Sequence, residues 1–184
     1  ANVESGAKTL LPLEMAAEGN VSEDGDNYFF VRPTYHNNVT KRYEGGRDRQ
    51  LWKYSEGTAE AVKLTKDYKG EDHHPVPHQD KLFFLSSRDG IVNVWSMDEN
   101  GGSLAQITKE PSFDVREFSI SGNQLVYRVG ADLKLMDLGT ANAKTLAIQL
   151  VSDFDQLREV WVDNPMSYLS NMAVSNDGER VVMT

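Results

Sequence analysis

The sequence lacks several features that would define a class of protein. It has no cysteine, which excludes disulfide bonds, thiolate metal sites and a cysteine nucleophile. No apolar run approaches the roughly 18 residues that a membrane-spanning helix needs. Basic residues are outnumbered: 19 Lys and Arg stand against 28 Asp and Glu, which gives a formal charge of −9. Because such a chain repels phosphate backbones and anionic lipid surfaces, we expect neither nucleic acid nor a membrane as its partner.

Helical periodicity is also missing, and short apolar segments repeat along the 184 residues instead. Pairs of identical residues lie 43 positions apart, namely Trp52 and Trp95, Thr65 and Thr108, and Leu82 and Leu125. The segments "VSEDGDNYFFV" (21–31) and "VSNDGERVVMT" (174–184) each place an Asp-Gly turn just before an apolar strand, as hairpins require. The chain is therefore expected to consist of repeated antiparallel units.

A period near 43 residues with several short strands per unit is typical of a β-propeller, whose blades are four-stranded antiparallel sheets. We therefore predict an all-β fold. In the copy at 80–108, "KLFFLS" and "VNVWSM" are the expected second and third strands, and "AQIT" is the outer strand. The predicted partial ring consists of an outer-strand remnant at 1–19, three full blades at 20–65, 66–108 and 109–150, and the start of a further blade at 151–184.

This predicted ring is incomplete. Propellers close with about four to eight blades, because closure protects the sheet edges. Here "KTLLPLEM" (8–15) resembles an outer strand with no blade before it, and the sequence stops just after a second strand. We expect the chain to be a piece of a longer protein. Its exposed blade edges favour self-association of two copies.

Several segments in a fixed order resemble the N-terminal six-bladed propeller of tricorn-type proteases and their bacterial homologues. These segments are "KRYEGGRDRQLWKY" (41–54), "KLTKDYKGEDHHPV" (63–76), "LFFLSSRDGIVNVWSMD" (82–98), "ITKEPSFDVREFSISG" (107–122) and "VSNDGERVV" (174–182). The ordered set is more specific than any single motif, because Ser-x-Asp-Gly turns also occur in Tol-associated and prolyl-oligopeptidase propellers.

The resemblance implies a large serine peptidase that trims oligopeptides, with its catalytic residues downstream of this segment. The sequence agrees, since it has no Gly-x-Ser-x-Gly elbow and no evident Ser/His/Asp set. We expect the chain itself to be non-catalytic, to need no cofactor or metal, and to scaffold or gate peptide access. Its partners would be peptides or other domains of the parent protease. Alternatives are a Tol-like interaction module and the propeller of a prolyl-oligopeptidase-type enzyme. Bacterial relatives imply a periplasmic or secreted location, and a cytoplasmic one stays open.

The densest group of ionisable residues is "GEDHHPVPH" (70–78), which holds three of the four histidines. Adjacent His73 and His74 point to opposite faces of an extended chain, and Pro75 and Pro77 forbid a helix that would pair His74 with His78. A metal site is therefore disfavoured against a polar loop stiffened by prolines, which runs from the rim towards the central channel. A part in lining a peptide channel rests on the resemblance.

A second group is the basic insert in the first blade, "RPTYHNNVTKRYEGGRDRQ" (32–50). Its arginines could receive a peptide carboxylate, although a solvated hairpin extension or a domain contact is the preferred interpretation. We expect architectural roles for Arg88-Asp89-Gly90 and for the Asp114–Arg116 pair, and core packing for Trp52 and Trp95. The peptide-channel or binding candidates are Lys41, Arg42, Arg47, Arg49, Asp72, His73, His74 and Arg116.

Overall fold

The computed structural model describes residues 4–8, 10–32, 48–149, 151, 154 and 157–184. The chain divides into two compact units, Ala1–Ala147 and Ile148–Thr184, and each is described by itself. The regular structure of the described residues consists of strands and short 3-10 segments, among them Pro165–Tyr168, with no α-helix. None of the helical segments that the structure describes is long and apolar enough to cross a membrane.

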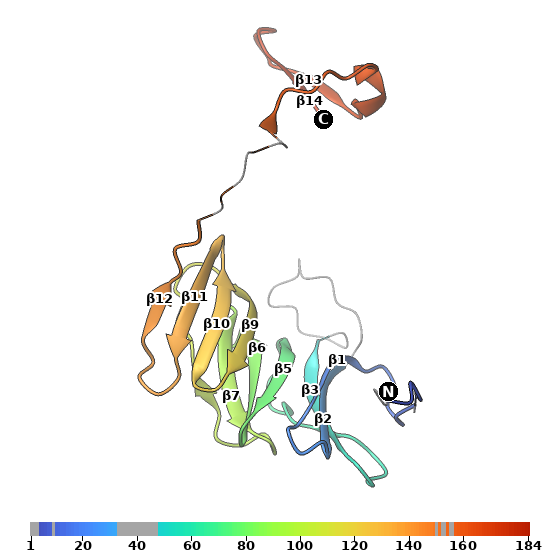
Figure 1. Ribbon diagram of the computed structural model, residues 1–184, viewed down its shortest axis with the longest axis vertical. Helices are drawn as coiled ribbons and strands as arrows, with labels where there is room; N and C mark the ends of the chain where they lie inside the picture. Colours follow the sequence, from blue (N-terminus) through green and yellow to red (C-terminus); the bar gives the residue numbers. More distant parts are fainter. Residues whose placement is uncertain (1–3, 9, 33–47, 150, 152–153, 155–156) are drawn as a thin grey trace. The chain divides into compact units, whose positions relative to one another are not determined.

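The first unit holds three four-stranded antiparallel sheets, each with its strands in chain order (Figure 1). The first sheet contains β1 (Ala17–Val21), β2 (Asn27–Arg32), β3 (Gln50–Ser55) and β4 (Val62–Lys63). The second contains β5 (Asp72–His78), β6 (Lys81–Ser86), β7 (Asn93–Asp98) and β8 (Ala105–Gln106). The third contains β9 (Val115–Ser121), β10 (Gln124–Val129), β11 (Asp132–Asp137) and β12 (Ala143–Thr145). This architecture confirms the predicted partial β-propeller.

The second unit contains a two-stranded sheet of β13 (Met172–Val174) and β14 (Val181–Met183). Its turn is built like the turn between β1 and β2. The Asn27 amide donates to Ser22 Oγ at 3.0 Å, and the Arg180 amide donates to Ser175 Oγ at 3.0 Å. The predicted Ser-x-Asp-Gly hairpins therefore form at both places, because each serine accepts a backbone amide at or just before the start of the following strand.

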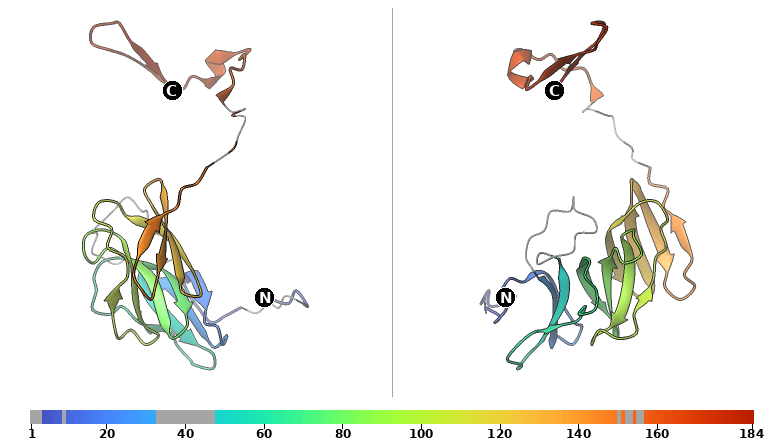
Figure 2. Two further views of the ribbon diagram at one scale, coloured as in Figure 1. Left: turned by 60° about the vertical axis from the view of Figure 1, so that its left-hand side comes forward. Right: turned by 180° about the vertical axis from the view of Figure 1, so that it is seen from behind.

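The second sheet has a neighbour on each of its faces (Figure 2). This explains why its strand "KLFFLS" is almost uniformly apolar, since alternate side chains enter two different cores. The first seam packs the first sheet against the second with Phe29, Val31, Leu51, Leu82, Phe84 and Met97. The second seam packs the second sheet against the third with Phe83, Leu85, Val94, Val115, Phe118, Leu125, Tyr127, Val129 and Met136.

Two buried threonines fasten the outer strands at equivalent places in the first two sheets. Thr65 Oγ1 accepts a hydrogen bond from the Leu51 amide at 3.1 Å. Thr108 Oγ1 accepts one from the Val94 amide at 2.8 Å. Each hydroxyl also donates to the amide side chain at the start of the third strand, Gln50 or Asn93. The 43-residue spacing of the threonines therefore reflects a repeated contact.

Residues 8 and 10–15 lie in no strand. One expectation about local structure is wrong: the Glu71–Pro75 stretch is no loop, because β5 begins at Asp72 and runs through both prolines. Strand β5 is the edge of its sheet, where the nitrogen of a proline can face away from the ladder. The ladder is irregular between His73 and Val76, and His74 has a φ of 55°.

Candidate functional site

Most candidate site residues that the structure describes lie on the first strands of the second and third sheets. Lys41, Arg42 and Arg47 of the basic insert lie outside the described residues. Arg49, which lies next to β3, is the candidate of the insert that the structure describes. The remaining candidates, Asp72, His73, His74 and Arg116, lie in or beside β5 and β9.

Arg49 is a buried link between the first two sheets. Its Nη1 lies 2.8 Å from Glu18 Oε1 on β1, and its Nε pairs with the Glu71 carboxylate just before β5. The Arg49 carbonyl also accepts the Asp72 amide at 2.9 Å. A guanidinium that is 7% exposed needs such carboxylates to offset the loss of its hydration. The structure therefore places Arg49 in an ion-pair network of the first seam.

The histidines of β5 reach the neighbouring sheets. His74 Nε2 lies 3.2 Å from the Phe118 carbonyl, and its ring meets the Phe118 ring edge-on at 5.0 Å. His78 Nε2 lies 2.7 Å from the Gly122 carbonyl. Because a carbonyl only accepts, each Nε2 must carry the proton. The His74 amide donates to Glu18 Oε2 at 2.8 Å, so this residue joins all three sheets.

His73 pairs with Leu85 in the β5–β6 ladder and is half-buried. In the part of the chain that the structure describes, no three His, Asp or Glu side chains converge as metal ligands would. The two histidines with described contacts serve packing between sheets.

Asp72 and Arg88 form an ion pair beside the first seam. The Asp72 carboxylate is fully buried, and its Oδ2 lies 2.7 Å from Arg88 Nη2. Burial raises the pKa of Asp72 above its usual value, and the Arg88 charge opposes that shift. The Arg88 guanidinium lies 4.5 Å from the Tyr68 ring centroid, 5.4 Å from that of Phe84 and 5.3 Å from that of Trp95. Arg88 is therefore held by stacking and by charge at once.

The first sheet has the same stacking of an arginine on aromatic rings, but among the described contacts no aspartate is paired with that arginine. The Arg32 guanidinium lies 5.1 Å from the Phe30 centroid and 4.9 Å from that of Trp52. Phe30 faces Trp52 across the ladder, as Phe84 faces Trp95. Trp95 packs against the first-seam cluster, which agrees with the expected core role. Trp52 is half-buried.

In the third sheet a polar cluster replaces the aromatic stack. Lys134, opposite Tyr127, takes the ladder position that Trp95 has opposite Phe84. Both side chains bind Glu110: the Tyr127 hydroxyl at 2.7 Å and Lys134 Nζ at 2.8 Å. Burial and the Glu110 carboxylate raise the pKa of Tyr127, so its hydroxyl stays a donor. This cluster was not predicted from the sequence, where its signal is a lysine at a ladder position that tryptophan holds in the first two sheets.

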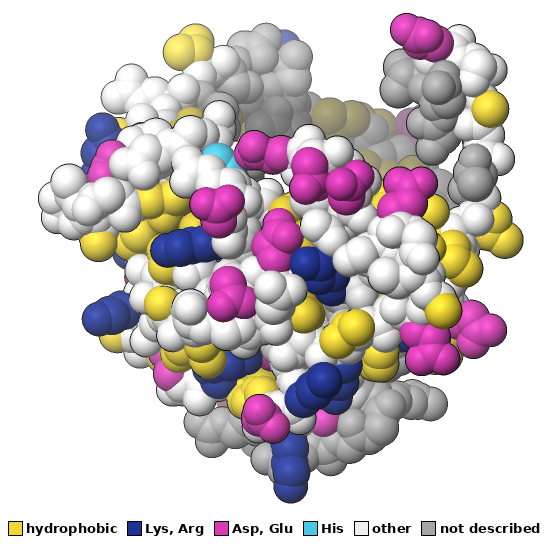
Figure 3. All heavy atoms as spheres, turned by 90° about the horizontal axis from the view of Figure 1, so that it is seen from below, with side chains coloured by type: hydrophobic (Ala, Val, Ile, Leu, Met, Phe, Trp, Pro, Cys, Tyr) yellow, Lys and Arg dark blue, Asp and Glu magenta, His cyan; other side chains and the backbone are white. Residues whose placement is uncertain are grey.

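Arg116 is the most exposed of the described candidates. Half of its side chain is accessible, and Nη2 lies 3.9 Å from Asp114 Oδ2. The other Asp114 oxygen accepts the Val92 amide at 3.0 Å. On the face shown in Figure 3, acidic, basic and hydrophobic side chains are interspersed. The structure does not bring Arg116 together with Arg49 in any described contact, so the described candidates make separate contacts.

Comparison with known proteins gives a consistent result. The family described as the tricorn protease N-terminal β-propeller domain matches residues 1–142. The tricorn protease of Thermoplasma volcanium is 27% identical over 168 residues, which is 91% of this chain and 16% of the relative. A tricorn protease homolog of Saccharolobus solfataricus is 26% identical over 96% of this chain and 16% of its own length. The chain thus spans about one sixth of these relatives.

Solved structures show the same fold. The crystal structure of the tricorn protease matches with a TM-score of 0.61 and 21% identity, over 71% of this chain and 12% of that chain. A putative TolB from Agrobacterium tumefaciens matches with a TM-score of 0.54 and 19% identity, over 68% of this chain and 46% of that one. A prolyl endopeptidase structure matches with a TM-score of 0.56 and 15% identity, over 71% of this chain and 19% of that one. At these identities the likeness concerns the propeller fold alone.

Proposed function

The chain belongs to the family of tricorn protease N-terminal β-propeller domains, and from this premise we propose that it is a non-catalytic scaffold of a tricorn-type serine peptidase. It would position peptides, or hold other domains of the parent protein, for a catalytic domain outside this sequence. The reaction served would be hydrolysis of oligopeptides. Three blades and part of a fourth would form the walls of the path that a peptide follows. Their sequence contains no recognisable nucleophile with a base partner.

The observation that supports this proposal is that candidate side chains make contacts between sheets. Arg49 is ion-paired within the first seam, and the ring nitrogens Nε2 of His74 and His78 donate to carbonyls of the third sheet. A general base needs a free lone pair directed at substrate, whereas these groups hold sheets together. Rigid spacing of the inner strands is what a scaffold for peptide passage requires.

A chimera tests the scaffold role. This chain would replace the matching segment of the Thermoplasma volcanium tricorn protease, and hydrolysis of a short fluorogenic peptide and of longer peptides would be compared. We expect kcat/KM for the short peptide to stay within about threefold of the parent, because the chemistry lies elsewhere. The dependence on peptide length should change. A folded, correctly assembled chimera that cleaves neither kind of peptide would contradict the proposal.

A further inference from the structure

The first strands of the first two sheets bulge at the same place. The ladder between β1 and β2 shifts at residues 18–19, where Glu18 has a φ of 50°. The ladder between β5 and β6 shifts at residues 74–75, where His74 has a φ of 55°. We call these pairs of residues the β1 bulge and the β5 bulge. Because residues other than glycine rarely adopt a positive φ, surrounding contacts must hold each bulge in place.

Side chains of β1 bind both residues of the β5 bulge. The His74 amide donates a hydrogen bond to Glu18 Oε2 at 2.8 Å. Asn20 Nδ2 donates one to the Pro75 carbonyl at 2.7 Å. The bond to Glu18 is the stronger kind, because its acceptor is an ionised carboxylate. The conformation of His74 is therefore held from the first sheet.

The Glu18 carboxylate is itself fixed in the first seam. Its Oε1 lies 2.8 Å from Arg49 Nη1, and Arg49 Nε pairs with the Glu71 carboxylate. The Arg49 carbonyl accepts the Asp72 amide at 2.9 Å. The first sheet thus fastens β5 before its bulge as well as within it.

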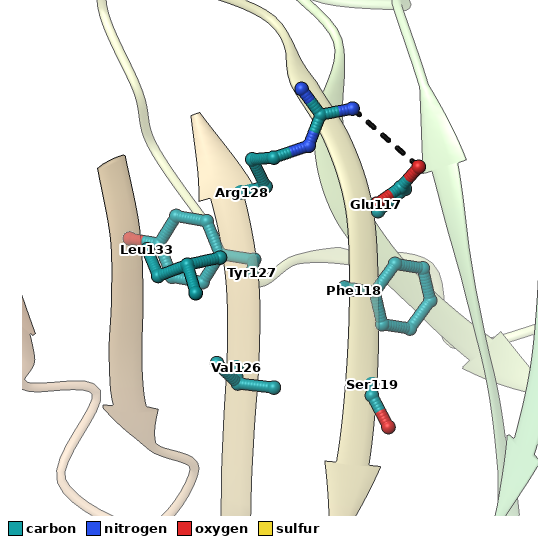
Figure 4. A pocket seen from close by; sticks show the side chains of 7 residues that line it. All are labelled: Glu117, Phe118, Ser119, Val126, Tyr127, Arg128 and Leu133. Atoms are coloured by element: carbon teal, nitrogen blue, oxygen red, sulfur yellow. Dashed lines mark ion pairs between the residues drawn. The ribbon is translucent and has the colours of Figure 1, made fainter. Parts of the chain in front are cut away.

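The β5 bulge directs the His74 ring to the third sheet. This ring meets the Phe118 ring edge-on at 5.0 Å, and His74 Nε2 lies 3.2 Å from the Phe118 carbonyl. Phe118, whose place on β9 is shown in Figure 4, is 6% exposed and belongs to the second seam. A bulge re-aims the side chains of its strand, so β5 without its bulge would direct the ring elsewhere. The contact of His74 with the second seam therefore depends on a conformation that the first seam holds.

We propose that the β5 bulge couples the two seams. The Glu18 carboxylate holds His74 in the left-handed conformation, and this conformation keeps the His74 ring on Phe118. Loosening the first seam at Glu18 therefore loosens the second seam, although Glu18 has no described contact with the third sheet. The coupling lies within the first unit, and it does not depend on the scaffold role.

Hydrogen exchange of backbone amides in the full chain tests the coupling. Glu18→Gln keeps the shape of the side chain but removes its charge, and it should lower the protection of the β9 amides about tenfold. The variant should still fold, because the Glu18 side chain is 36% exposed and lies outside both hydrophobic clusters.

Glu99→Gln is the matched control. Glu99 Oε2 lies 3.4 Å from Lys53 Nζ, so this carboxylate also joins the first two sheets, and it has no described contact with β5. Its loss should lower the protection of the β3 amides. The protection of the β9 amides should stay within about twofold of the wild type.

A double-variant cycle isolates the part of His74. Asparagine tolerates the left-handed region but lacks the ring, so His74→Asn alone should lower the protection of β9. Adding Glu18→Gln to His74→Asn should then lower it by less than about a further twofold.

Three results would overturn the proposal. The first is unchanged protection of β9 in Glu18→Gln. The second is an equal loss in Glu99→Gln, which would mean that any weakening of the first seam spreads to the third sheet. The third is a full further loss when Glu18→Gln is added to His74→Asn, which would mean that the coupling bypasses the His74 ring.

Discussion

At the residue scale, buried polar groups repeat as regularly as the hydrophobic ones. Thr65 and Thr108 make the same hydrogen bonds in successive sheets, and both are at most 7% exposed. The spacing of these threonines is visible in the sequence, but their role is not, because a Thr at a strand end is equally common on the surface. Asp72 and Arg88 likewise meet only through the fold, since Arg88 lies in a turn and Asp72 on the edge strand.

Removing the Thr108 hydroxyl should destabilise the fold. Thr108→Val keeps the shape but leaves the buried Val94 amide without its acceptor, so the free energy of unfolding should fall by about 1–3 kcal/mol. Thr65→Val should have a similar effect through Leu51. The exposed Thr58→Val, as a control, should change stability by less than about 0.5 kcal/mol. Chemical denaturation measures all three, and a Thr108→Val variant as stable as the control would contradict the assigned contact.

The buried carboxylate of Asp72 should make stability depend on pH. Its folded pKa is raised, mainly by burial, so its contribution to stability is fully present below the unfolded pKa near 4. The contribution is lost as pH rises through the folded pKa. Relative to Asp72→Asn, the wild type should therefore lose stability as the pH rises above about 4.

Urea denaturation of both proteins at several pH values checks the prediction for Asp72, with the exposed Asp80→Asn as the matched control. A difference between the wild type and Asp72→Asn that stays constant across this pH range, or that favours the wild type as pH rises, would show that the Arg88 charge outweighs burial.

At the element scale, most of the fold could be predicted. Apolar runs such as "KLFFLS" and the turns between them predicted the strands of the second sheet, because these signals are local. Strand β5 was not predicted, since Pro75 and Pro77 argue against a strand unless its N–H groups face away from the ladder. Whether a strand is an edge depends on the sheet around it.

The turn between β7 and β8 should tolerate no side chain at Gly101. This glycine has a φ of +92°, and a Cβ there would lie 2.9 Å from the Leu64 carbonyl of the first sheet. Gly57 has a φ of +81° with nothing within 4 Å, so it is a matched control. Gly57→Ala should cost about 1 kcal/mol from backbone strain alone. Gly101→Ala should cost more by about 1 kcal/mol or above, because two sheets must separate. Equal losses of stability in the two variants, measured by thermal or urea unfolding, would mean that Gly101 is not in close contact with the first sheet.

At the scale of the whole molecule, the three sheets of the first unit form a row joined by two seams, and Arg49, Asp72 and His74 make their contacts at or beside those seams. The sequence identified Arg49, Asp72 and His74 as unusual, yet it could not predict their partners Glu18, Arg88 and Phe118. These partners come from strands in other repeats or from other parts of the same sheet. Long-range contacts of this kind depend on how the blades stack, and no local sequence pattern predicts that stacking.

The claim that this chain is non-catalytic is tested most directly by a peptidase assay on the purified chain alone. Fluorogenic peptides with free and blocked termini would be incubated with micromolar protein, and cleavage followed by fluorescence and mass spectrometry. We predict no turnover above the buffer blank, because the sequence has no Gly-x-Ser-x-Gly elbow and no evident Ser/His/Asp set. Cleavage that copurifies with the chain, and that one Ser→Ala substitution abolishes while the fold is retained, would contradict the account.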